Sequence, residues 1–137
     1  MQRCNKVKNM KIIMFVSICS FFVMSLSFTL MYFIKSAVIC GFLIWIPFIL
    51  GIVTQLIMRS SVSKDRRVGL FSIFSNRYAI FADAVFLISL IAFILSLILS
   101  NVPGAMITYI LLSVVVFSFC MHCILNGRIF NSILNEK

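Results

Sequence analysis

Hydrophobic residues along the chain gather in four long runs that contain few polar side chains. The runs cover residues 12–34, 37–58, 79–100 and 106–125. About 20 consecutive apolar residues, each rising about 1.5 Å in a helix, cross a hydrocarbon core about 30 Å thick. A lone strand in lipid would leave its backbone groups unpaired, so each run is expected to be a helix. The pattern predicts an all-α, polytopic integral membrane protein with a single membrane domain and four transmembrane helices.

Polar breaks of different lengths divide the four runs into two pairs. Lys35 and Ser36 separate the first two runs, and residues 101–105, which include a Pro-Gly step typical of turns, separate the last two. A longer polar segment at 59–78 lies between the pairs, and a tail at 126–137 follows the last run. The chain is therefore expected to form two helical hairpins joined by a loop.

Composition and charge indicate a membrane location and an orientation. Hydrophobic residues make up 63% of the chain and charged residues 11%, which excludes an ordinary soluble globular domain. Of the 12 Lys and Arg residues, all except Lys35 lie before the first run, in the loop or in the tail. Basic flanks stay on the cytoplasmic side during insertion, so both termini and the loop are expected to be cytoplasmic. The first run is followed by no small-residue cleavage site, so we expect a retained helix.

The loop at 59–78 is basic in its first half and mixed in its second. Its cations are predicted to bind anionic lipid headgroups; they are Arg59, Lys64, Arg66, Arg67 and Arg77. Residues 68–78 either lie flat in the membrane interface or extend the third helix. The net charge is +9, but no aromatic and basic binding module is visible, so the predicted partner is a bilayer with anionic headgroups and not a nucleic acid. Abundant Ile, Phe, Asn and Lys with little Ala and Gly suit the cytoplasmic membrane of a low-GC bacterium.

Besides serines and threonines, the runs contain one amide, one acid and one histidine, each near the predicted cytoplasmic end. Gln55, Asp83 and His122 lie about 5 to 8 Å from that end at about 1.5 Å per residue. One interpretation is that Asp83 and His122 pair, with Gln55 nearby, in a proton-responsive or cation-binding site. The other is structural, because a helix N-terminus stabilises the Asp83 charge and a helix C-terminus the His122 charge.

The five cysteines include one spaced pair, Cys120 and Cys123, in a C-x-x-C. This spacing is similar to that of four-helix membrane redox enzymes such as vitamin K epoxide reductase and the bacterial disulfide-generating quinone reductases, and it would imply a redox role. The sequence has no second cysteine pair in a loop, and a thiol near a helix C-terminus gains little thiolate stabilisation. With three acidic residues and one His in the chain, we expect no catalytic residues, metal centre or cofactor.

Small residues recur at four-residue spacing in the last three runs, which favours close helix packing in lipid. They are Ala37 and Gly41, then Ala92, Ser96 and Ser100, then Gly104 and Thr108. The spacing predicts a compact four-helix bundle and lateral contacts with other helices.

Two function classes follow from these features. The first is a small non-catalytic membrane protein that acts through helix–helix contacts with itself or a larger membrane partner, as accessory, immunity-type or regulatory subunits do. The second is a small transporter or channel subunit that uses Gln55, Asp83 and His122. In its size and helix number the chain resembles the small multidrug resistance transporters, whose dimers use a carboxylate on the first helix. The first run here has no acidic residue, so the resemblance implies that Asp83 takes this role.

Overall fold

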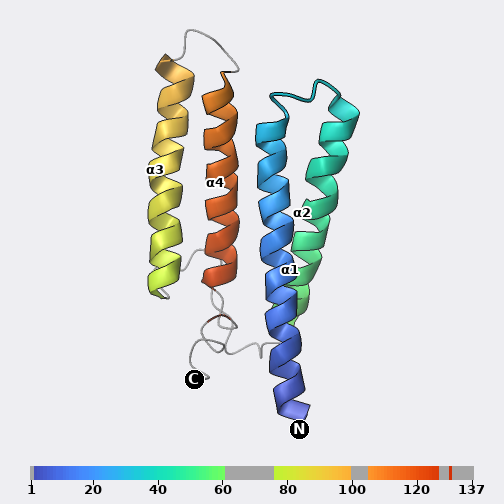
Figure 1. The fold of residues 1–137 in the computed structure, drawn as a ribbon. Helices are drawn as coiled ribbons and strands as arrows, with labels where there is room; N and C mark the ends of the chain where they lie inside the picture. Colours follow the sequence, from blue (N-terminus) through green and yellow to red (C-terminus); the bar gives the residue numbers. More distant parts are fainter. Residues whose placement is uncertain (1, 61–75, 100–104, 127–129, 131–137) are drawn as a thin grey trace.

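The computed structural model describes residues 2–60, 76–99, 105–126 and 130, with side chains described from Asn9 onward (Figure 1). Its helices are α1 (Gln2–Leu30), α2 (Ala37–Ser60), α3 (Arg77–Leu99) and α4 (Met106–Leu125). Each contains a stretch long and apolar enough to cross a membrane. The prediction of an all-helical chain with four candidate membrane spans is therefore confirmed.

Helix α1 differs at both ends from the apolar run that predicted it. It begins at Gln2, ahead of the run, because backbone hydrogen bonding continues through polar residues once the chain leaves the hydrocarbon. It ends at Leu30, and the N–H of Tyr32 then bonds the oxygen of Thr29 at 3.2 Å, which tightens the last turn. Hydropathy marks the residues that lipid can cover, and it does not mark the residue at which the backbone leaves the helix.

One asparagine fixes the start of α3 and joins it to the end of α4. The Asn76 side-chain oxygen accepts the N–H of Ala79 at 2.9 Å, which is the usual N-cap bond. Its amide nitrogen donates to the Leu125 carbonyl at 2.6 Å. Of the segment 68–78, Asn76 is thus the cap and the two residues after it belong to α3, while 68–75 lie outside the described residues.

The helices form a row in which α1 packs against α2, α4 against α1, and α3 against α4 (Figure 1). Neighbours run antiparallel. Between α1 and α2, Gln55 contacts Ser17 near one end and Ser27 contacts Leu43 near the other. Between α4 and α1, ring contacts link Phe22 to Phe117 and, just after the end of α1, Tyr32 to Tyr109. Between α3 and α4, Asn76 contacts Leu125 near one end, and Ser96 contacts Thr108 near the other.

The row is more open than the compact bundle predicted from the small residues. Among the described residues α2 and α3 make no extended contact with each other. The reason lies in how the buried residues are distributed. On α1 they spread over an arc of about 160°, which serves two neighbours, whereas the buried Ala79, Ala82 and Ser89 of α3 share one face and serve one.

The small residues differ in how closely a neighbouring helix approaches them. An ideal Cβ at Gly41 would have no heavy atom within 4 Å, so this glycine has open space beside it. At Gly51, by contrast, a Cβ would lie 2.5 Å from an atom of the Phe21 ring. Ser96 and Thr108 do meet across α3 and α4, with their hydroxyl oxygens 3.4 Å apart.

The apolar core lies where α1, α4 and α2 meet. Its buried members are Phe21, Met24, Cys120 and Ile124, and Ile44 and Phe48 of α2 are among the side chains packed against them. α3 takes no part in this cluster, and among the described residues its extended contact is with α4.

Candidate functional site

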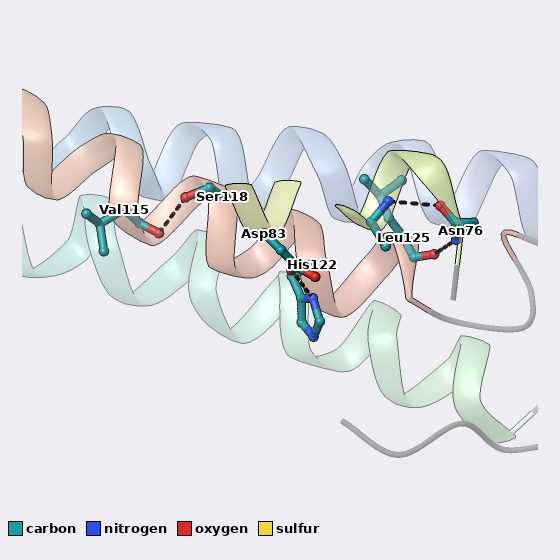
Figure 2. A network of polar contacts seen from close by, with 7 residues as sticks. Asn76, Asp83, Val115, Ser118, His122 and Leu125 are labelled. Atoms are coloured by element: carbon teal, nitrogen blue, oxygen red, sulfur yellow. Dashed lines mark hydrogen bonds and ion pairs between the residues drawn. The ribbon is translucent and has the colours of Figure 1, made fainter. Parts of the chain in front are cut away.

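The structure brings Asp83 of α3 and His122 of α4 into direct contact (Figure 2). The Nδ1 atom of His122 lies 2.5 Å from Oδ1 of Asp83. The antiparallel register explains the pairing, because the contact of Asn76 with Leu125 places both residues about two turns or less from the same end of the helices. Their side chains are 11% exposed for His122 and 19% for Asp83. The pair is therefore a mostly buried contact between two helices.

The second oxygen of the Asp83 carboxyl group is not hydrogen-bonded. Among the described residues Oδ2 is buried and has no hydrogen-bond partner. A carboxylate normally accepts several hydrogen bonds, and in apolar surroundings its charge is costly unless it is paired. The hydrogen bond from the Asp83 carboxyl group to a side chain is thus the contact of Oδ1 with His122.

Aromatic rings and a cap enclose the pair along the interface of α3 and α4. One turn further from the Arg77 end, the rings of Phe86 and Phe119 lie 5.7 Å apart between centroids. On the other side, Asn76 joins the two helix ends through the Leu125 carbonyl (Figure 2). The polar site therefore lies between a hydrogen-bonded helix end and an aromatic contact.

The side chain of Gln55 makes a contact away from this pair. Its amide nitrogen donates to the Ser17 hydroxyl at 3.0 Å, which joins α2 to α1. Ser17 is completely buried. The predicted layer of three polar residues is thus divided into two contacts, Gln55 with Ser17 and Asp83 with His122.

Two serine contacts between helices were not predicted from the sequence. The Ser27 hydroxyl donates to the Leu43 carbonyl at 3.0 Å, between α1 and α2. The Ser113 hydroxyl donates to the Ser25 carbonyl at 2.5 Å, between α4 and α1. Serines are so common in the chain that their spacing does not single these out, and only the helix register does. Other serines, such as Ser118 in Figure 2, bond carbonyls within their own helix.

The candidate thiol pair, Cys120 and Cys123, flanks His122 in the sequence. Cys120 is buried in the apolar core, and Cys123 is half-buried; neither forms a disulfide. Among the described residues no group of three His, Cys, Asp or Glu side chains is arranged to hold a metal ion. His122, which lies between the two cysteines in the sequence, contacts Asp83 on the neighbouring helix.

The described basic side chains lie near the ends of the helices, at the two opposite ends of the antiparallel arrangement. Arg59 at the end of α2 and Arg77 at the start of α3 are exposed, as is Lys11 on α1, and the antiparallel register places all three at one end. Exposed Lys35 lies at the other end, between α1 and α2. The other predicted headgroup ligands, Lys64, Arg66 and Arg67, fall outside the described residues.

Comparison of the chain with protein-family models, with curated proteins and with solved structures finds no match. Its function is therefore inferred from its own helices, contacts and charges.

Proposed function

We propose that the chain is a multi-pass protein of two helical hairpins in the cytoplasmic membrane of a low-GC bacterium, with both ends and the loop 59–78 in the cytoplasm. It works without catalysis, through helix–helix contacts with itself or with a larger membrane protein. The supporting observations are the four apolar helices and the distribution of charge.

The charge at the two ends supports this orientation. Lys11, Arg59 and Arg77 lie at one end of the antiparallel helices, and Lys35 lies at the opposite end. Basic residues remain on the cytoplasmic side, where anionic headgroups attract them. Reporter fusions at Lys35 and in the loop test the assignment, because the orientation is wrong if the loop reporter is active outside the cell.

The outer surface of α3 is the observation on which lateral association depends. In an apolar 18-residue stretch of α3, 11% is buried inside the protein, against 33% in the corresponding stretch of α1. The face of α3 opposite α4 carries a stripe of exposed residues at alternating spacings of three and four, which is the spacing of a helix–helix seam. The stripe consists of Phe81, Ala84, Ile88, Ile91, Leu95 and Ile98.

Cross-linking in native membranes tests this proposal. A photoreactive side chain at Ile88, within the stripe, is expected to give a defined adduct, either a dimer of the chain or one larger complex. The same probe at Ile46, on the exposed face of α2, is the matched control. A strictly monomeric chain with no protein adduct at Ile88 would contradict lateral association through α3.

A second function is favoured by the contact of Asp83 with His122. Buried ionisable pairs between membrane helices are rare, and they commonly mark ion or proton pathways. We propose, as the alternative, that the chain is a small transporter or channel subunit that uses this pair. Asp83→Asn and His122→Ala should then abolish flux in proteoliposomes, while Cys123→Ser should retain it. Unchanged flux in both site variants would exclude the pair from transport.

A further inference from the structure

The Asp83 and His122 side chains together have no net charge when one proton is shared between them. The two side chains are mostly buried between α3 and α4, and Oδ2 of Asp83 has no hydrogen-bond partner among the described residues. Net charge in such a place is strongly disfavoured. Removing the proton leaves a negative pair, and adding a second proton leaves a positive one. The neutral state therefore has one proton between the carboxyl group and the imidazole.

The pair offers a ligand set that suits a proton better than a metal ion. A structural zinc ion takes four ligands and a calcium ion six to eight. In the described part of the chain, no third His, Cys, Asp or Glu joins this pair as a possible metal ligand. A proton needs one donor and one acceptor at hydrogen-bond distance, and the 2.5 Å between Nδ1 and Oδ1 supplies this.

The site lies closer to the end of the protein that carries Arg77 than to the opposite end, so the path for proton exchange is shorter from the Arg77 end. Asp83 lies six residues after Arg77, which is about 9 Å along the helix. In the other direction, the Phe86 and Phe119 rings lie against each other, followed by the apolar remainder of the α3 and α4 interface. The Arg77 end is therefore the nearer helix end for water and buffer, and the two rings lie on the opposite side of the pair.

The surrounding titratable groups are also concentrated at that end. Arg77 is on the same helix as Asp83, Cys123 is next to His122, and Lys11 of α1 and Arg59 of α2 lie on the other two helices. The three cations are exposed, so they influence the pair through solvent and headgroups.

We propose that Asp83 and His122 form a proton-binding site that holds one proton between them and exchanges it from the Arg77 end. In one form the Oδ1–H group of Asp83 donates to Nδ1 of a neutral His122. Transfer breaks the O–H bond and forms the N–H bond, giving carboxylate and imidazolium with no change in net charge. This site is the one used in the second proposed function, but proton binding at equilibrium requires no flux.

The single histidine makes the site directly observable. Selective ¹⁵N labelling of histidine gives imidazole signals from His122 alone, because the chain contains one His. Because the neutral pair also keeps a proton on Nε2, which a negative pair with an Nδ1–H imidazole lacks, we expect in proteoliposomes of uniform orientation a protonated Nε2 and a strongly deshielded proton at Nδ1. Asp83→Asn should abolish this signal, and Cys123→Ser, the control next to His122, should keep it. Persistence of the signal in Asp83→Asn would overturn the shared proton.

The direction of access has its own readout. When the pH is changed in one compartment at a time, the His122 signals should follow the compartment at the Arg77 end. Phe119→Ala removes the ring facing Phe86, and its His122 signals should respond to both compartments. If the wild-type signals follow the Lys35 side, or if Phe119→Ala leaves the response one-sided, the proposed access is wrong. A chain that shows the Nδ1 proton but no flux would contradict transport and leave this proposal intact.

Discussion

The contact of Gly51 with Phe21 allows a sharp test of how α1 and α2 pack. A methyl group added at Gly51 would lie 2.5, 2.7 and 2.9 Å from three atoms of the Phe21 ring. Phe21 is 5% exposed and belongs to the apolar core, so its ring has little room to move away. Gly51→Ala should therefore force the two helices apart or move the ring out of its packed position.

A matched variant isolates the size of this effect. Gly41→Ala is on the same helix, and its new methyl group meets no heavy atom within 4 Å. Both variants gain the same helix propensity, about 1 kcal/mol in water, because alanine replaces glycine. Overpacking a core costs about 1 to 3 kcal/mol, and Gly51→Ala alone bears this cost. The free energies of unfolding of the two variants should thus differ by about 1 to 3 kcal/mol, with Gly41→Ala the more stable.

Equilibrium unfolding with SDS in mixed micelles measures this difference. The single tryptophan, Trp45 on α2, provides a fluorescence signal, and far-ultraviolet circular dichroism checks that the transition is two-state. In Phe21→Leu, which removes the ring, the cost of Gly51→Ala should largely disappear, as a double-mutant cycle would show. Equal stability of Gly51→Ala and Gly41→Ala would refute the close approach at Phe21.

Substitutions at three other residues test the polar contacts by the same unfolding assay. Asn76→Ala should lower the free energy of unfolding by about 1 to 2 kcal/mol, since it removes the cap of α3 and the bond to α4; Asn76→Ser, which keeps a cap, should restore part of this. Ser27→Ala should cost about 0.6 kcal/mol through the lost bond to Leu43. Gln55→Leu should cost about 0.5 to 1.5 kcal/mol because buried Ser17 loses its donor.

For each of these residues, one outcome would contradict the expected result. If Asn76→Ser is no more stable than Asn76→Ala, the cap does not stabilise α3. If Ser27→Ala is neutral, the hydroxyl bond to Leu43 does not stabilise the α1 and α2 interface. A Gln55→Leu variant as stable as wild type would show that the Gln55 contact with Ser17 does not support the α1 and α2 interface.

The sequence was sufficient for the number and type of elements because the hydrocarbon core imposes them. A run of about 20 apolar residues has one stable backbone form in lipid, so each run could be assigned as a helix without knowledge of its neighbours. Its ends were less certain. α1 begins at Gln2 and ends at Leu30, and neither point coincides with a change in hydropathy, because backbone hydrogen bonds set these ends. In the same way, the cap at Asn76 sets the start of α3.

The sequence by itself determined which residues are chemically conspicuous, since Gln55, Asp83 and His122 are polar side chains in apolar runs. The tertiary structure decided their partners. Asp83 meets His122 because α3 and α4 run antiparallel in one register, and Gln55 meets Ser17 because α2 packs against α1. It also decided that Gly51, and not Gly41, lies at a close approach. Hydropathy depends on each residue alone, whereas these contacts depend on which faces of two helices meet, and several registers satisfy the same apolar pattern.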